Sequence, residues 1–315
     1  MEYIFLIVGF VLLIKGADFF VDGASSIASK LKIPSLIIGL TVVSIGTSLP
    51  EAAVSISASL SGTNDISLGN VIGSNLFNLL VVIGVSSAIL PIATDADILK
   101  RDMPINLAIT AAFFLMLLDG TLSRVDAAIL LLFLVVYMFM LIRTAMKQNV
   151  EEQPDRKVLS WLKSIIFVVC GAAAIILGGQ LVVESAKKIA ATLGMSETLI
   201  GLTVVAIGTS LPELVTSIVA AKKGDSGIAM GNVMGSCIFN ILFILGLTGI
   251  ITPMTASVAI FIDTGILIGV GILMLLFAYS GKKTSRWEGI ASTLLYVVYT
   301  AYIIMRAYDI CGLGL

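Results

Sequence analysis

The chain has 315 residues, of which 58% are hydrophobic and only 12% charged, and its formal net charge is −1. Soluble domains usually carry about 25% charged residues, so this composition excludes an ordinary water-soluble domain and favours a helical membrane protein with many spans. The apolar runs are continuous rather than alternating, which excludes a β-barrel, and the absence of a basic tail argues against a nucleic-acid partner.

Ten apolar stretches follow one another along the chain, each near the length of about 20 residues that a transmembrane helix needs. We predict an all-α membrane protein with ten transmembrane helices at 3–29, 35–60, 67–91, 103–119, 124–146, 161–190, 197–221, 228–252, 257–279 and 287–307. The longest polar segment, 147–160, is the expected linker. It separates a first half, 1–146, from a second half, 161–315, and each half has five helices.

Lysine and arginine are unevenly distributed over the two sides that these spans define. With the N-terminus outside, fourteen fall on the inner side and four on the outer side, and Lys15 lies within the first span. Cytoplasmic loops carry an excess of these residues. We therefore expect a multi-pass protein of the plasma membrane, with both termini extracellular and the linker cytoplasmic.

The two halves contain copies of one sequence. At an offset of 162 residues, GLTVVSIGTSLPEAAVSISA (39–58) matches GLTVVAIGTSLPELVTSIVA (201–220) at 15 of 20 positions. GNVIGSNLFN (69–78) matches GNVMGSCIFN (231–240) at 7 of 10. Because five spans is an odd number, the second copy is expected to be inverted relative to the first. Inverted repeats with broken helices at the centre are an architecture of secondary transporters.

Each copy places Gly-Thr-Ser-Leu-Pro-Glu in the middle of an apolar span, ending at Glu51 and at Glu213. A proline inside a helix removes a backbone hydrogen bond and interrupts the helix. An ionisable side chain at the centre of a bilayer costs about 2.5–3.5 kcal/mol even on mild insertion scales. Two glutamates at equivalent positions, each beside a proline, therefore predict a cation site rather than packing.

Other polar side chains extend this set. Thr47 and Ser48 lie three or four residues before Glu51, so we expect their hydroxyls on its helix face. In the next span of each copy, a serine and an asparagine four residues apart share a face: Ser74, Asn78, Ser236 and Asn240. All these donors are hard oxygens, which suit calcium or sodium rather than soft metals.

The second motif also contains glycines in small-xxx-small patterns, which predict close helix packing: Gly69, Gly73, Gly231 and Gly235. Asn70 and Asn232 are expected either to satisfy freed backbone groups or to line the ion path, and Cys237 is expected to pack.

Several ionisable residues lie outside these motifs. Asp22 and Glu184 are repeat equivalents nearer the ends of their spans, and for them a helix-tethering role and a place on the ion path both stay open. Asp18, Asp119 and Asp263 are expected to be interfacial or paired.

At these motifs the chain resembles the sodium/calcium exchanger family, whose signature is a pair of such repeats, and the resemblance covers all ten spans. It implies a minimal, prokaryotic-type transport core, in which glutamates and nearby oxygens bind calcium and sodium alternately. The ligands that it implies in this chain are Thr47, Ser48, Glu51, Ser74, Asn78, Thr209, Ser210, Glu213, Ser236 and Asn240, with the backbone carbonyls of Ser44 and Ala206 as further candidates.

One position departs from the family pattern. Several members carry aspartate where this chain has Asn240, so two carboxylates rather than three are expected at the centre. This disfavours potassium dependence and leaves the sodium stoichiometry open.

We expect a secondary active antiporter, not an enzyme, that exchanges sodium for calcium by alternating access. No cofactor is expected; the partners are the two ions and the lipid bilayer, and the oligomeric state is open, a monomer included. The alternatives are a cation/proton exchanger that uses the same two glutamates, a channel and an intramembrane enzyme. The inverted repeat argues against a channel, and the lack of histidine and of a nucleophile–base pair argues against an enzyme.

Overall fold

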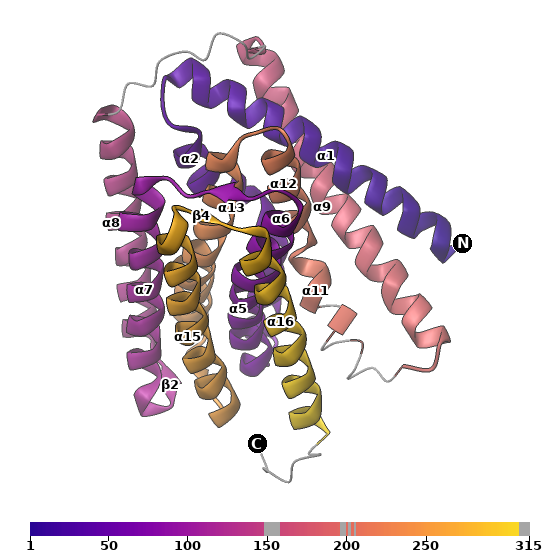
Figure 1. The fold of residues 1–315 in the computed structure, drawn as a ribbon. Coiled ribbons are helices and arrows are strands. Elements are labelled where there is room, and N and C mark those ends of the chain that lie inside the picture. Colours follow the sequence, from indigo (N-terminus) through magenta and orange to yellow (C-terminus); the bar gives the residue numbers. More distant parts are fainter. Residues whose placement is uncertain (148–157, 196–199, 201–202, 205, 309–315) are drawn as a thin grey trace.

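The computed structural model describes residues 1–147, 158–195, 200, 203–204 and 206–308, and most of this part of the chain is helical (Figure 1). Eight of its helices are long and apolar enough to cross a membrane, and there are nine if the bent pair Ser35–Thr47 and Leu49–Leu60 is one span. These eight coincide with eight predicted spans, and the bent pair is the second. The predicted span 197–221 and the linker 147–160 lie partly outside the described residues.

The first half contains five long helical regions. Its helices are α1 (Glu2–Leu31), α2 (Ser35–Ile38), π-helical η1 (Gly39–Val43), α3 (Ser44–Thr47), α4 (Leu49–Leu60), α5 (Asn64–Phe77), π-helical η2 (Asn78–Val82), α6 (Ile83–Ile89), π-helical η3 (Ile98–Asp102), α7 (Met103–Met116), the 3-10 turn η4 (Leu117–Asp119) and α8 (Arg124–Lys147).

The second half repeats this order where the structure describes it. Its helices are α9 (Trp161–Thr192), α11 (Ala206–Thr209), α12 (Leu211–Lys222), α13 (Ser226–Phe239), π-helical η6 (Asn240–Leu245), α14 (Gly246–Ile251), α15 (Val258–Gly281) and α16 (Arg286–Ala307).

Four two-residue strands add a small β component to the expected all-α fold. They are β1 (Ile92–Ala93), β2 (Thr121–Leu122), β3 (Met254–Thr255) and β4 (Lys283–Thr284). β1 pairs antiparallel with β4, and β2 with β3, at opposite ends of the bundle (Figure 1). The 162-residue offset takes β1 to β3 and β2 to β4, so exchanging the two halves converts one pairing into the other.

α1 and α9 lie side by side as a long tilted pair (Figure 1). A Cβ atom on Gly9 would lie 2.9 Å from the carbonyl oxygen of Gly178, and one on Gly16 would lie 2.9 Å from that of Gly171. Such a close backbone approach requires small residues. Gly171 and Gly178 are the offset equivalents of Gly9 and Gly16, so this contact too is preserved when the halves are exchanged.

The centre of the protein is formed by the two spans that carry the second motif, Asn64–Ile89 and Ser226–Ile251. In the most apolar stretch of each of these spans, 78% and 72% of the residues are buried. In the other six long helices the share is 11–39%. The outer helices leave many large apolar side chains exposed, such as Leu294 and Val298 on α16. This distribution fits a membrane protein whose outer helices face lipid.

α13 packs against α2 and η1 through Gly231 and Gly235, as the small-xxx-small pattern predicted. For Gly69 and Gly73 in α5 the prediction is wrong, because a Cβ there would meet at most a side-chain carbon at 3.8 Å. A Cβ on Gly231 would lie 2.7 Å from the carbonyl oxygen of Leu36, and one on Gly235 would lie 2.7 Å from that of Leu40. This contact holds the polar face of α13 against the helix break that follows α3.

The helix breaks predicted at the repeated motif are present. The chain bends by 49° between α3 and α4, and Ser48 at the bend has φ −86° and ψ 6°. Ser210, between α11 and α12, has almost the same conformation, φ −95° and ψ 8°. In each copy the proline that follows has no N–H to continue the helical hydrogen bonds.

The aspartates expected to be paired or interfacial have partners. Asp18 lies 2.7 Å from the Nζ atom of Lys223, and Asp263 lies 2.8 Å from a guanidinium nitrogen of Arg306. Asp119 accepts a hydrogen bond from the backbone of Thr121 at 2.9 Å.

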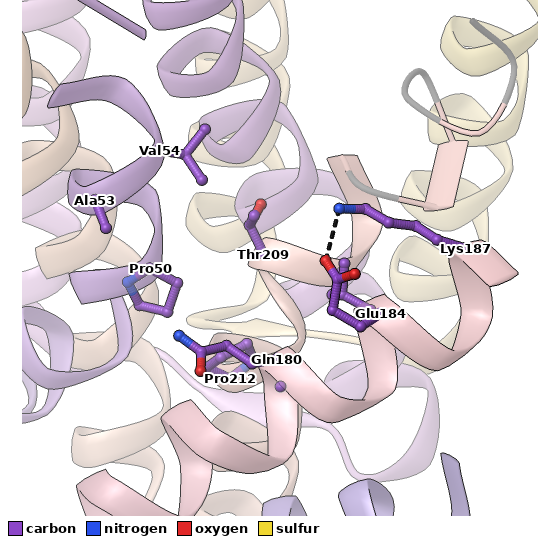
Figure 2. Close-up of a pocket in the computed structure, with 11 residues that line it drawn as sticks. Pro50, Ala53, Val54, Gln180, Glu184, Lys187, Thr209 and Pro212 are labelled. Carbon is purple, nitrogen blue, oxygen red and sulfur yellow. Dashed lines mark hydrogen bonds and ion pairs between the residues drawn. The ribbon is translucent and has the colours of Figure 1, made fainter. Parts of the chain in front are cut away.

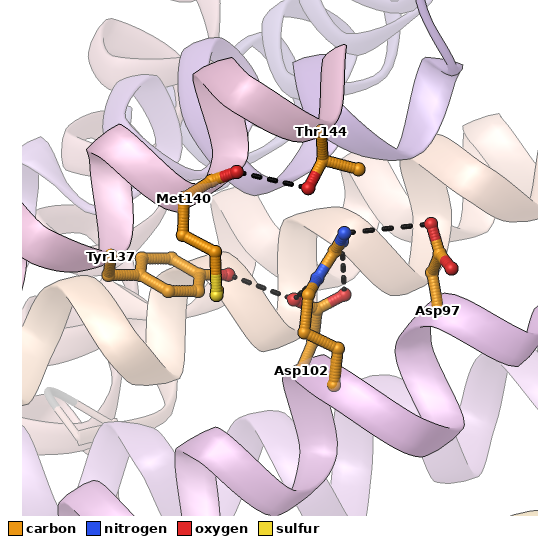
Figure 3. A network of polar contacts seen from close by, with 6 residues as sticks. Asp97, Asp102, Tyr137, Met140 and Thr144 are labelled. Carbon is orange, nitrogen blue, oxygen red and sulfur yellow. Dashed lines mark hydrogen bonds and ion pairs between the residues drawn. The ribbon is translucent and has the colours of Figure 1, made fainter. Parts of the chain in front are cut away.

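One buried charge was not anticipated (Figure 3). Asp102 is fully buried and accepts two hydrogen bonds of 2.9 Å from the guanidinium of Arg101 and one of 3.3 Å from the hydroxyl of Tyr137. Arg101 also lies 3.5 Å from Asp97. This network joins the start of α7 to α8. Arg101 and Asp102 lie within the span Ile98–Asp119, which begins five residues before the predicted start at 103.

Candidate functional site

The two glutamates of the repeated motif are completely buried, with exposures of 1% for Glu51 and 0% for Glu213. The Oε1 atom of each accepts a hydrogen bond from a serine of the other copy. The Ser210 hydroxyl donates to Glu51 at 3.0 Å, and the Ser48 hydroxyl donates to Glu213 at 2.9 Å. The Ser48 hydroxyl, which was predicted on the helix face of Glu51, therefore bonds the glutamate of the other copy.

Two asparagines hold the backbone of both glutamates. Asn70 donates a hydrogen bond to the carbonyl oxygen of Glu51, and Asn232 donates one to that of Glu213, each at 3.2 Å. Thr47, which was also predicted on the Glu51 face, donates instead to the side-chain oxygen of Asn232 at 2.9 Å. These contacts fix α4 to α5 and α12 to α13, so the two carboxylates have rigid supports.

Several polar side-chain atoms at the centre are buried without a hydrogen-bond partner. They are the Oε2 atoms of Glu51 and Glu213, the Oδ1 atom of Asn240, and both amide atoms of Asn78. Buried polar atoms nearly always have partners, and an unpaired buried carboxylate is costly. Unpartnered oxygens beside two carboxylates are therefore suited to binding a cation.

The remaining predicted ligands lie around this centre. Ser236 donates to Oε1 of Glu213 at 3.4 Å, and Ser74 is buried at the equivalent position of α5. Asn78 and Asn240 each begin a π-helical segment, a feature that is common at functional sites.

The three other candidates lie beside the helix breaks. The carbonyl oxygen of Ser44 already accepts the amide of Ser48 at 3.0 Å and the hydroxyl of Thr47 at 3.3 Å. Ala206 is the first residue of α11, and Thr209 is the last.

A cavity of about 340 Å³ adjoins these motifs (Figure 2). Pro50, Thr209 and Pro212 line it from the two broken helices, and Gln180 and Glu184 line it from α9. Pro50 and Pro212 directly precede the two glutamates in sequence, so the cavity lies beside the site, although neither glutamate lines it.

At the opposite end, α1 and α2 contact the α12–α13 connection. Lys223 lies 2.7 Å from Asp18 and 2.6 Å from Asp22. Ser25 and Ser35 donate to the two carboxylate oxygens of Asp225, at 2.8 and 2.7 Å.

Asp22 and Glu184 therefore have different roles, although they are equivalent in the repeat. Asp22 tethers α1 to Lys223, whereas Glu184 lines the cavity and pairs with Lys187 at 2.9 Å. The offset equivalent of Lys223 is Ser61, so an equivalent ion pair cannot form at the cavity end.

Sequence reasoning missed the crossed serine–glutamate contacts and the tethers at Lys223 and Asp225. The signal for the first is that an inverted repeat brings equivalent motifs face to face across its axis. The signal for the second is two charged residues in one copy whose equivalents, Ser61 and Thr63, are neutral.

Comparisons with known proteins agree with this arrangement. Residues 1–143 and 163–305 match the sequence family described as sodium/calcium exchanger protein. The chain is 36% identical to the sodium/calcium exchanger MaX1 of Methanosarcina acetivorans, over 95% of this chain and 97% of that protein. It is 37% identical to the inner membrane protein YrbG of Escherichia coli, over 95% of each.

The fold has a close counterpart among solved structures. A structure of the sodium-calcium exchanger NCX_Mj, soaked with sodium and calcium, superposes with a TM-score of 0.84 at 34% identity. The match covers 95% of this chain and 97% of that one.

Proposed function

This chain belongs to the sodium/calcium exchanger family, and on that premise we propose that it exchanges sodium for calcium across the membrane by alternating access. The observation that carries the proposal is the pair of buried carboxylates. Glu51 and Glu213 each have one oxygen held by a serine of the other copy and one oxygen without a partner.

The proposed architecture is ten transmembrane helices in two inverted five-helix repeats, 1–146 and 161–315, joined by a cytoplasmic linker at 147–160. The exchange symmetry of the strand pairings, of the α1–α9 glycines and of the serine–glutamate contacts supports it. The excess of lysine and arginine on one side supports extracellular termini at the plasma membrane.

The proposed ion ligands surround the two glutamates. They are side-chain oxygens of Thr47, Ser48, Glu51, Ser74, Asn78, Thr209, Ser210, Glu213, Ser236 and Asn240, and the backbone carbonyls of Ser44 and Ala206. Hydroxyl, amide and carboxylate oxygens are the ligands that calcium takes in proteins.

The coupling follows from charge. Two ionised carboxylates give the site a charge near −2, which one calcium ion or more than one sodium ion can neutralise. Burying two unneutralised carboxylates is costly, so a conformational change without a cation is disfavoured. Calcium and sodium would therefore move in alternate turns rather than leak.

The conformation has an access side. The cavity beside Pro50 and Pro212 lies at the end that the proposed orientation makes extracellular, and the Lys223 ion pairs lie at the cytoplasmic end. In the alternating-access cycle, release of calcium to the other side requires these ion pairs to break and the cavity to close.

The test is calcium-45 uptake into proteoliposomes that contain the purified protein. A sodium gradient should drive calcium uptake, whereas potassium and pH gradients of equal size should not. Uptake driven by a pH gradient without sodium would identify the cation/proton exchanger instead. Uptake that needs no counter-ion would identify a channel.

A further inference from the structure

The two copies of the second motif differ at one polar position beside the site, where the first copy has Asn75 and the second has Cys237. Both side chains are buried, at 1% and 0% exposure. The Nδ2 atom of Asn75 donates to the carbonyl oxygen of Cys237 at 3.0 Å, and the Cys237 sulfur lies 3.9 Å from the carbonyl oxygen of Asn75. Since the two positions are repeat equivalents in mutual contact, they lie where the copies meet.

The contact with Cys237 determines which way the Asn75 amide faces. A backbone carbonyl can only accept a hydrogen bond, so the Asn75 side chain must present its nitrogen to it. Its oxygen is then left for Asn240, whose Nδ2 atom donates to it at 3.0 Å. The Asn240 amide is fixed in turn, and its own oxygen is the atom that stays free.

That free oxygen lies near the carboxylates. The Oδ1 atom of Asn240 is buried without a hydrogen-bond partner. Asn240 follows Ser236 by one helical turn on the same face, and the Ser236 hydroxyl lies 3.4 Å from Oε1 of Glu213. If the amide were turned over, Asn240 would offer N–H groups to a cation instead of an oxygen.

Asn78, the repeat equivalent of Asn240, faces the thiol of Cys237 instead of an amide. The residue in the place of Asn75 is Cys237, and a thiol is a weak hydrogen-bond acceptor. Both amide atoms of Asn78 are buried without partners. The two asparagines are therefore held differently, although they occupy equivalent positions in the repeat and in their helices.

We propose that Asn75 is a positioning residue that fixes the amide of Asn240 with its oxygen free for the transported cation, while Cys237 gives the amide of Asn78 only a weak thiol contact. The proposal rests on the proposed exchange function. It makes Asn240 a defined oxygen ligand, and it makes the two neutral side chains of the site, Asn78 and Asn240, unequal.

The test is the calcium KM and the maximal rate of sodium-driven calcium uptake in proteoliposomes. Asn75→Ala should raise the calcium KM about five-fold, the factor that corresponds to the loss of one hydrogen bond of ~1 kcal/mol. Its maximal rate should stay within about two-fold of that of the unmodified protein. In an Asn240→Ala background, Asn75→Ala should have no further effect on the KM, because Asn75 acts through Asn240. If Asn75 had only a structural role, Asn75→Ala would raise the KM by the same factor with Asn240 present and with Asn240→Ala.

Two variants at the equivalent position complete the test. Cys237→Ala keeps the backbone carbonyl that orients Asn75, so its KM should match the unmodified protein. Cys237→Asn supplies Asn78 with an amide partner and should lower the KM, which tests the idea independently if Asn75→Ala does not fold.

An unchanged KM in Asn75→Ala, or an equal effect in both Asn240 backgrounds, would overturn the inference while leaving the exchange function intact. An unchanged KM in a folded Cys237→Asn would overturn the proposed weak hold on the Asn78 amide. An unmodified protein without sodium-driven calcium uptake would instead refute the exchange function, and the inference with it.

Discussion

Replacing one central glutamate by glutamine removes a charge while leaving the shape of the side chain almost unchanged. In Glu213→Gln, the amide oxygen can still accept the hydrogen bond that Ser48 donates at 2.9 Å, so the protein should keep its fold. The unpartnered Oε2 atom becomes an NH2 group that repels a cation. The same reasoning holds for Glu51→Gln, with Ser210 as the donor at 3.0 Å.

The size of the effect follows from the burial of the site. Glu213 is 0% exposed, so water cannot replace the lost carboxylate. Removing one partner of a buried ion pair costs about 3–5 kcal/mol, which corresponds to a loss of calcium affinity of about 150- to 5000-fold. At calcium concentrations that saturate the unmodified protein, sodium-driven flux should therefore be abolished.

The assay combines calcium-45 uptake in proteoliposomes with equilibrium calcium binding and a melting curve in detergent. Glu2→Gln makes the same chemical change at the periphery, where Glu2 lies 3.5 Å from Lys188, and it should leave flux unchanged. Near-normal flux in both Glu51→Gln and Glu213→Gln would refute the assignment of the site. Lost flux with a collapsed melting curve would show that the carboxylates act in folding instead.

Three further predictions concern the scaffold. Lys223→Ala removes the ion pairs that hold α1, so hydrogen exchange in the part of α1 around Asp18 and Asp22 should accelerate; unchanged exchange would show that these pairs do not hold that end. Asp102→Asn leaves a half-buried guanidinium without its main partner and should lower the melting temperature by several degrees, whereas Asp97→Asn, at a more exposed carboxylate, should have little effect. Gly231→Ala would place a Cβ 2.7 Å from a backbone oxygen and should destabilise the protein, while Gly269→Ala, with open space around it, should not; equal melting temperatures would contradict the packing argument.

The sequence was most informative where structure depends on local chemistry. The bend at Ser48 could be predicted because a proline two residues later removes a hydrogen bond wherever the helix lies. The fifth span was predicted at 124–146 and observed as Arg124–Lys147, because a continuous apolar run admits one conformation in a bilayer.

Contacts between distant segments were harder to predict. The Ser48–Glu213 hydrogen bond joins residues 165 positions apart and depends on how the two copies meet. The start of the fourth span was placed at 103 because Arg101 and Asp102 look like loop residues, yet their mutual hydrogen bonds let both lie inside a helix that begins at Ile98. In both cases a polar side chain is satisfied by a partner that the local pattern does not reveal.

An exact inverted repeat would make the two ends of the protein equivalent, and neither access state would then be preferred. A preference must therefore come from positions where the copies differ. Lys223 has Ser61 as its equivalent, and Asp18 has Gln180, so ion pairs hold α1 at one end while a cavity opens along α9 at the other. The same argument applies at the centre, where Asn75 orients the amide of Asn240 and Cys237 gives Asn78 only a weak thiol contact. In the proposed exchanger the repeat supplies the ligands, and the departures from the repeat determine which side they face and how firmly they are held.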